Sequence, residues 1–153
     1  MNDISDFFDY FFDDDVINLI VTYTNKRLKE DEKTNAIEIR AFIGLMLLFG
    51  VTKKNDVDIG EIWCSDSVHH LNYASAGMTR SRFQRLSNKI TFDDIETRFI
   101  RQRQYGKFYL IHEFFEIIRK KVVNAFNPGM NLKVDEQLYS FRGRCSFRQY
   151  MKS

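Results

Sequence analysis

The segment with the clearest chemical potential lies near the end of the sequence, which reads LKVDEQLYSFRGRCSFRQYMKS. Period-two alternation places Leu132 and Val134 on one face of a predicted strand, so Asp135 projects from the opposite face where that strand ends. A carboxylate at a strand end is a suitable single ligand for a hard cation such as Mg²⁺. The simpler interpretation is a solvated acid that enters a turn, because one aspartate alone does not make an active site.

Three arginines and three aromatic residues follow Asp135 within a short stretch. Arginine binds phosphate through two parallel hydrogen bonds, and aromatic rings among arginines can stack on nucleobases or pack in a core. The stretch is therefore either a phosphate-binding surface or an amphipathic hairpin whose basic residues lie in solvent, and both interpretations stay open. The residues are Arg142, Arg144 and Arg148 for the charge, with Phe141, Phe147 and Tyr150 for the rings.

Other residues with metal-binding side chains have spacings that favour structural roles. His69 and His70 are adjacent, so they cannot chelate one metal at positions i and i+4, and Cys64 has the wrong spacing to complete a zinc site. The acids at 13–15 and 93–94 precede predicted helices, where negative charge suits the helix N-terminus. We therefore predict that both acidic runs cap helices.

The composition is that of a soluble globular protein with one domain. The chain has 153 residues, of which 44% are hydrophobic and 29% charged, and its 15 Phe residues predict a core rich in aromatic packing. Cys64 and Cys145 show no paired spacing, which favours a reducing compartment. The longest apolar stretch, at 41–51, is too short to span a membrane. We expect a soluble, intracellular protein.

Charge is distributed unevenly along the sequence although the net charge is only +2. Residues 1–97 hold 11 Lys and Arg against 17 Asp and Glu, a net charge of −6, whereas residues 98–153 hold 12 against 4, a net charge of +8. A basic C-terminal third predicts a polyanionic partner such as nucleic acid. An ordinary solvated basic face is the alternative.

Hydrophobic periodicity predicts a mainly helical chain up to about residue 128. Asn35 is placed to cap the helix that follows it, with Glu38 as the reciprocal partner in a capping box. Because residues 41–49 are apolar nearly all round, that helix is expected to be central and buried. After Pro128 the period-two pattern predicts the opening strands of a sheet. The predicted helices cover residues 13–30, 35–50, 58–67, 79–89 and 105–129, with a further cap at Asp93 and Glu96.

Several stretches, taken in order, carry a family resemblance. They include EIRAFIGLMLLFGVTKK, MTRSRFQRLSNKITFDD and FYLIHEFFEIIRKKVVNAFNPG, and the most specific is the final LKVDEQLYSFRGRCSFRQYM. That last block combines a strand, Asp-Glu, Phe-Arg-Gly-Arg and Phe-Arg-Gln-Tyr-Met. Together these stretches, which span nearly the whole chain, resemble the piggyBac transposase family.

The resemblance implies a cut-and-paste DNA transposase with an RNase H-like catalytic domain, in which three separated aspartates hold Mg²⁺. Asp135 matches the first of these aspartates, and Arg142, Arg144 and Arg148 would face DNA phosphates. The preceding helices would serve dimerisation and binding of double-stranded transposon ends, with TTAA target sites and a nuclear location. The expected fold class is mainly α, α+β, with a helical region at 1–129 and the first strands of an incomplete RNase H-like domain at 130–153.

The sequence stops at QYMKS, before the positions where the family carries its second and third aspartates. We therefore expect no DNA cleavage or strand transfer by these 153 residues alone. A domesticated, non-enzymatic DNA-binding or interaction protein is the alternative, and an inert fragment is a third interpretation. Arg80, Arg82 and Arg85 are weaker candidates for phosphate contacts, since they can equally form a solvated helix face.

Overall fold

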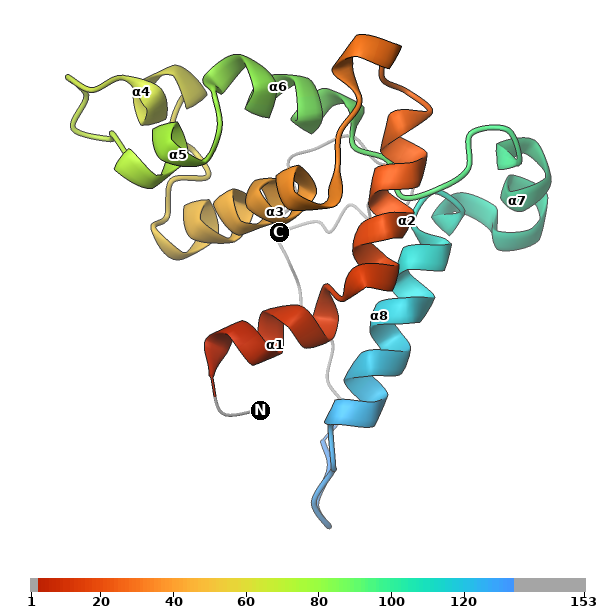
Figure 1. Cartoon of the computed structure of the whole chain (residues 1–153). Coiled ribbons are helices and arrows are strands. Elements are labelled where there is room, and N and C mark those ends of the chain that lie inside the picture. Colours follow the sequence, from red (N-terminus) through yellow and green to blue (C-terminus); the bar gives the residue numbers. More distant parts are fainter. Residues whose placement is uncertain (1–2, 134–153) are drawn as a thin grey trace, which may run out of the picture. The chain divides into compact units, whose positions relative to one another are not determined.

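Helices account for most of the computed structural model, which describes residues 3–133 (Figure 1). The mainly helical class is thus confirmed, and no strand occurs in the described range. Residues 131–133 are irregular, so the predicted strand is not present there, and the rest of it lies outside the described residues. The elements are α1 (Ile4–Phe11), α2 (Asp14–Asn25), η1 (Glu30–Glu32), α3 (Ala36–Val51), α4 (Ile59–Trp63), α5 (Asn72–Gly77), α6 (Arg80–Lys89), α7 (Arg98–Tyr105), η2 (Gly106–Phe108) and α8 (His112–Ala125).

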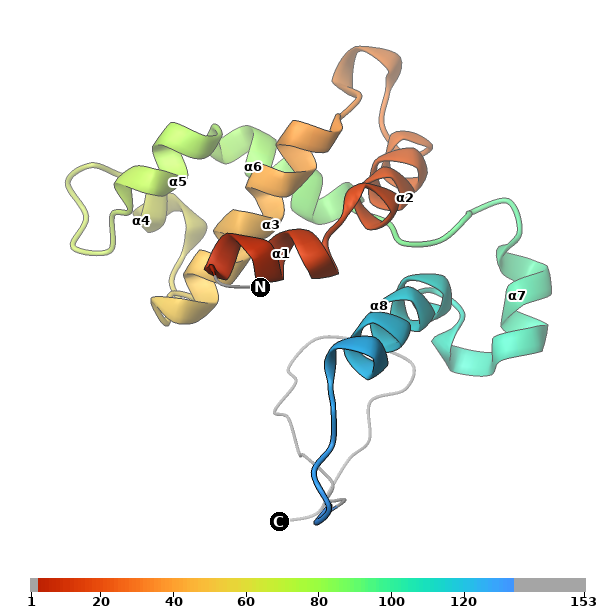
Figure 2. The ribbon, with the colours of Figure 1, turned by 60° about the horizontal axis from the view of Figure 1, so that its bottom comes forward.

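The chain divides into two compact units, one from Met1 to Phe92 and one that begins at Asp93. The first unit holds α1 to α6, and its core forms where α3 packs against α2, α5 and α6 (Figures 1 and 2). Val16, Ile17 and Ile20 of α2 are fully buried, as is Ile39 of α3. The predicted division of the chain at residues 129 and 130 stays a prediction.

Four aromatic rings join α3, α4 and α6 in this core. Phe83 of α6 lies 5.1 Å from the ring of Phe42 and 5.5 Å from that of Phe49, measured between ring centroids. The indole of Trp63 meets Phe83 at 5.1 Å and Phe49 at 5.9 Å. Edge and tilted contacts of this kind add to the apolar area that the rings bury. They fix α4 and the N-terminal half of α6 against α3.

Helix α3 is less buried than its sequence predicted. Phe42, Leu45 and Phe49 lie in the core, but Met46 and Leu47, within the apolar stretch 41–49, are each 50% exposed. A helix buries only the stripe that its neighbours cover, and apolar residues elsewhere on its surface remain in solvent. The helix is thus central, as expected from its sequence, because it packs against α2 and α5, but it is only partly buried.

Helix caps occur at two of the predicted positions. Asp13 caps α2, since its carboxylate accepts a hydrogen bond from the Val16 N–H at 3.1 Å. Asn35 caps α3 by accepting from the Glu38 N–H at 3.0 Å. The Glu38 side chain does not complete the predicted capping box, because it accepts from Arg82 and from the Thr34 hydroxyl instead. A charge-assisted bond to a guanidinium outcompetes a bond to one backbone N–H.

Arg82 connects α6 to α3 and to the segment before it. Its guanidinium donates to both Glu38 carboxylate oxygens, at 2.6 and 2.7 Å, and to the carbonyls of Glu32 at 2.8 Å and Lys33 at 3.2 Å. Both charged side chains are only 23% exposed. The hydrogen bond from Arg82 keeps the pKa of Glu38 below its ordinary value of 4.5, partly opposed by burial of the carboxyl.

In the second unit, the acids at 93–94 do not cap a helix as predicted. Asp93 is buried and accepts two hydrogen bonds from the Arg98 guanidinium, at 2.7 and 2.8 Å. Helix α7 begins only at Arg98, with Thr97 at its N-cap and no side-chain capping bond. A buried carboxylate requires a charged partner, and Arg98 supplies it five residues along the chain.

The helix predicted at 105–129 is also shorter than expected. Gly106 has a φ of +58°, which glycine adopts readily, and it ends α7 at the first residue of the short η2. Helix α8 then starts at His112, where the His112 ring stacks on Tyr105 at 3.7 Å and Phe115 meets Phe108 at 5.0 Å. The chain leaves the helix after Ala125, close to the predicted stop at Asn127-Pro128-Gly129.

We predict that Arg82→Ala lowers the free energy of unfolding of the first unit by about 2–4 kcal/mol, because it leaves a mostly buried carboxylate without its partner. Arg85→Ala is the matched control in the same helix. Its side chain is 46% exposed and pairs with Glu32, so its loss should cost less than about 1 kcal/mol. Urea unfolding followed by circular dichroism measures both, and equal losses would contradict the structural role of Arg82.

The Glu38–Arg82 pair also predicts a pH dependence. Because the pKa of Glu38 is lowered in the folded chain, its stabilisation is complete above 4.5 and declines as the pH falls through the folded pKa. The difference in unfolding free energy between the wild type and Glu38→Gln should therefore be largest near pH 7 and shrink below about pH 4. A difference that is the same at both pH values would show that the carboxylate charge is not involved.

Candidate nucleic-acid interface

The residues that the sequence favoured for metal and phosphate binding lie outside the described range. Asp135 and the three arginines Arg142, Arg144 and Arg148 all follow residue 133. Their assignments stay predictions.

Most basic side chains of the described range are engaged within the protein. In α6, Arg82 pairs with Glu38 and Arg85 with Glu32, so neither is a simple solvated face or an open phosphate contact. In the second unit, Arg98 pairs with Asp93, while Arg101 lies 3.6 Å from a Glu113 carboxylate oxygen. Within residues 98–133, the formal positive charge therefore overstates the charge available to a partner.

Arg80 is the exception among the arginines of residues 3–133. It makes no hydrogen bond, ion pair or ring contact within the described structure, although it is exposed at the first position of α6. Every other arginine in that range donates to an oxygen or, in the case of Arg103, lies over the Phe99 ring at 4.4 Å. An exposed guanidinium without a partner can bind an anion without first breaking an internal contact.

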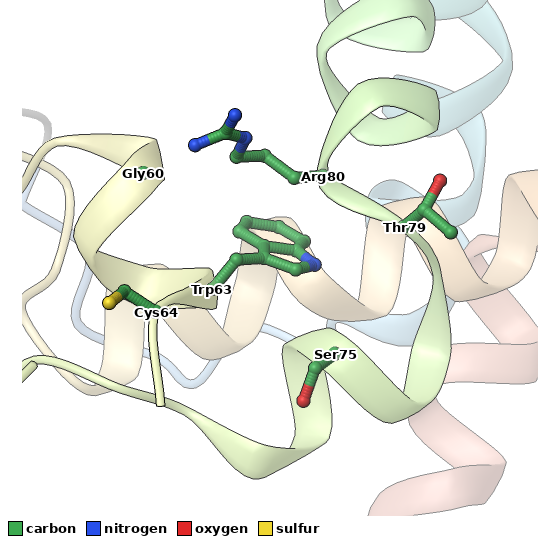
Figure 3. A pocket seen from close by; sticks show the side chains of 6 residues that line it. All are labelled: Gly60, Trp63, Cys64, Ser75, Thr79 and Arg80. Atoms are coloured by element: carbon green, nitrogen blue, oxygen red, sulfur yellow. The ribbon is translucent and has the colours of Figure 1, made fainter. Parts of the chain in front are cut away.

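Arg80 lies at the edge of an open pocket in the first unit (Figure 3). The pocket has a volume of about 550 Å³, within the range of small-ligand sites. It brings together an indole ring, a guanidinium, two hydroxyls and a thiol from α4, α5 and the start of α6. The lining residues are Gly60, Trp63, Cys64, Ser75, Thr79 and Arg80.

Local capping and packing fix the pocket walls. The Asp58 carboxylate caps α4 through the Gly60 N–H at 2.6 Å, and the Thr79 hydroxyl caps α6 through the Arg82 N–H at 3.3 Å. Trp63 is held by its indole N–H, which donates to the Met78 carbonyl at 2.9 Å. Since its ring also packs on Phe49 and Phe83, the indole presents a fixed surface to the pocket.

Gly60 makes room for the Arg80 side chain, which extends toward it across the indole in Figure 3. A Cβ atom at residue 60 would lie 3.3 Å from Arg80 Nη1 and 2.7 Å from Asp58 Oδ1. The same geometry places the Asp58 carboxylate near the guanidinium, although no ion pair joins them. The pocket thus carries a guanidinium without a hydrogen bond or ion pair, with a carboxylate that caps a helix near it.

Residue types and spacing alone do not point to this pocket. The helix predicted at 58–67 includes Trp63, but the pattern assigns this residue no role, and it does not distinguish Arg80 from Arg82 or Arg85. The signal that separates Arg80 from Arg82 is helical phase, since residues two positions apart face different directions on a helix. That signal becomes useful only once the buried face of α6, which includes Phe83 and Leu86, is known.

The described residues do not build a metal site. No group of three or more His, Cys, Asp or Glu side chains gathers within residues 3–133. His69 Nδ1 lies 2.9 Å from Lys54 Nζ, and its Nε2 lies 3.7 Å from Glu61. In the same range, every helix is too short or too polar to cross a membrane.

Comparison with known proteins places the chain in a family. Residues 3–153 match the family described as Transposase IS4, and because the match covers almost the whole sequence, the chain belongs to that family. The predicted transposase relationship is thereby confirmed.

One solved structure shares the fold. The chain is similar to a piggyBac transposase in a cryo-EM structure of its synaptic complex with hairpin DNA, with a TM-score of 0.84 and 30% sequence identity. The similarity covers 99% of this chain and 33% of that one, so the chain spans about a third of the piggyBac transposase it matches. The piggyBac resemblance seen in the sequence therefore extends to the fold.

Proposed function

We propose that this chain is a DNA-binding part of a DDE-type transposase of the piggyBac kind. The observation that carries the proposal is the fold similarity over 99% of the chain to a transposase that was solved with DNA. The family match over residues 3–153 supports the same class. By this proposal the partner is double-stranded DNA, namely transposon ends flanked by TTAA sites, and the protein acts in the nucleus.

Asp135 is proposed as one magnesium ligand of the transposase, in line with its position in the motif VDEQ. The described residues do not supply the remainder of a metal site, because no suitable cluster of acids occurs in residues 3–133. A reaction that uses two metal ions requires several carboxylates in one place. We infer that these 153 residues bind DNA without cleaving it, and that cleavage would need ligands from elsewhere.

A non-enzymatic DNA-binding protein is the second candidate. The unpaired Arg80 beside an aromatic ring favours it, because that arrangement serves binding and needs no metal. Homodimerisation is proposed for the helical region in either case. The exposed apolar residues Ile37 and Val51 of α3 support a self-association surface.

DNA binding predicts a steep salt dependence. The affinity of the chain for a TTAA-containing duplex, measured by fluorescence anisotropy, should fall as salt rises, because bound phosphates release counterions. Arg142→Gln, Arg144→Gln and Arg148→Gln should each reduce the slope of log K against log salt by about 1. Arg119→Gln is the matched control, since that guanidinium is engaged by Glu116 at 2.7 Å. No measurable duplex binding by the wild type would refute the proposal.

The absence of catalysis by the isolated chain is a separate prediction. With Mg²⁺ and a supercoiled or end-containing duplex, we expect no nicking above background, because one carboxylate does not hold two ions against water. Asp135→Ala should behave identically to the wild type in this gel assay. Magnesium-dependent cleavage that disappears in Asp135→Ala would show instead that the chain assembles a complete active site.

A further inference from the structure

The pocket of the first unit combines two features that recognise different parts of one ligand. Arg80 offers a guanidinium without an internal partner, and Trp63 offers a ring held in place by Phe49, Phe83 and the Met78 carbonyl. The two side chains border the same open volume of about 550 Å³. A ligand that satisfies both needs an anionic group and a flat apolar surface a short distance apart.

We propose that the Trp63–Arg80 pocket binds one unpaired nucleotide of single-stranded DNA. Its phosphate binds the Arg80 guanidinium, and its base lies against the Trp63 indole. This assignment rests on the proposed DNA-binding function but adds a defined site and a preference for unpaired DNA.

The chemistry of the pocket favours a nucleotide over a simple anion. Guanidinium groups bind phosphate through paired N–H donors, and the hydroxyls of Ser75 and Thr79 line the same volume. Stacking of a base on an aromatic side chain is tolerant of sequence, because every base has a π-face. An acidic peptide would satisfy Arg80 but would leave the indole without a matching flat group.

The same stacking requirement selects unpaired DNA. Inside a duplex both faces of a base are covered by its neighbours, so the base must leave the stack before a protein ring can contact it. Figure 3 shows Arg80, at the start of α6, and Trp63 of α4 on the border of the same pocket, with the Arg80 side chain extending past the indole toward Gly60. The open pocket of about 550 Å³ that both side chains line can accept a ligand.

Asp58 provides a second test of this assignment, in which a substitution should raise the affinity. Its carboxylate caps α4 through the Gly60 N–H and lies near Arg80, where its negative charge opposes phosphate binding. Asparagine at this position retains a capping oxygen but removes the charge. Asp58→Asn should therefore strengthen binding, whereas loss of the Arg80 charge should weaken it.

The intrinsic fluorescence of Trp63 reports on the pocket directly, because it is the only Trp in the chain. The full chain is titrated with an oligothymidylate of about ten nucleotides, a length suited to single-strand sites. We expect quenching of Trp63, and weaker quenching by a duplex of equal length. Arg80→Gln should lower the oligonucleotide affinity about tenfold, as expected for a charge-assisted contact to phosphate. Asp58→Asn should raise it.

Lys29→Gln is the matched control variant. Lys29 belongs to the same unit, is exposed and does not line the pocket, so its loss removes the same charge at another place. Its affinity should change less than about threefold, the effect of one distant screened charge. Circular dichroism and urea unfolding check that all variants fold, which is expected because Arg80 makes no hydrogen bond or ion pair in the described structure.

The outcomes separate this inference from the proposed function. If the chain binds duplex by anisotropy but Trp63 is not quenched by the oligonucleotide, or Arg80→Gln matches Lys29→Gln, the pocket assignment is overturned and DNA binding stands. Quenching by a glutamate-rich peptide that also displaces the oligonucleotide would assign the pocket to an acidic protein partner. Failure to bind either form of DNA would overturn both.

Discussion

The Arg82–Glu38 contact is the interaction on which the first unit depends. One guanidinium joins α6 to the first turn of α3 and to two carbonyls of the preceding segment, and it is mostly withdrawn from solvent. Such a pair requires all of its partners in place, because a buried charge without compensation is costly. By fixing the start of α6, the pair also fixes Thr79 and Arg80, which border the pocket. The contact that stabilises the fold thus sets the position of the side chain left free to bind.

Local sequence patterns predicted helices well and their contacts poorly. Helix α6 was expected at 79–89 and runs from Arg80 to Lys89, and Asn35 and Asp13 cap as their residue types suggest. Helices α1 and α5 were not predicted. Errors arose where a side chain had a choice of partner: Glu38 bonds Arg82 rather than its own helix start, and Asp93 bonds Arg98 rather than a first helical turn. Capping rules consider only the backbone N–H groups at a helix start, whereas these two carboxylates form stronger hydrogen bonds with arginine side chains.

In the candidate site, too, the sequence predicts features that depend on adjacent residues and does not predict those that depend on distant ones. Sequence identified three arginines in α6 but not which of them is unengaged, because Glu38 precedes Arg82 by 44 residues and Glu32 precedes Arg85 by 53. Trp63 could be placed on a helix, yet its role depends on Phe49 and Phe83 from two other helices. Asp135 and the arginines that follow it are the opposite case: a motif carried by adjacent residues, recognisable from sequence and independent of the described structure.

Formal charge is consequently a weak guide to where a polyanion binds this protein. The first 97 residues carry a net charge of −6, yet several of their acids are used within the fold. Asp13 caps α2, whereas Asp14 pairs with Arg40 and Glu38 with Arg82. An acid paired with a guanidinium contributes little electric field beyond the pair, because the two opposite charges largely cancel. Salt also screens exposed charges beyond about 8–10 Å at physiological ionic strength. The same holds for cations, because Arg98 and Arg119 are matched by Asp93 and Glu116. What a phosphate meets is the unmatched remainder, and within the described residues Arg80 belongs to that remainder despite lying in the acidic part of the sequence.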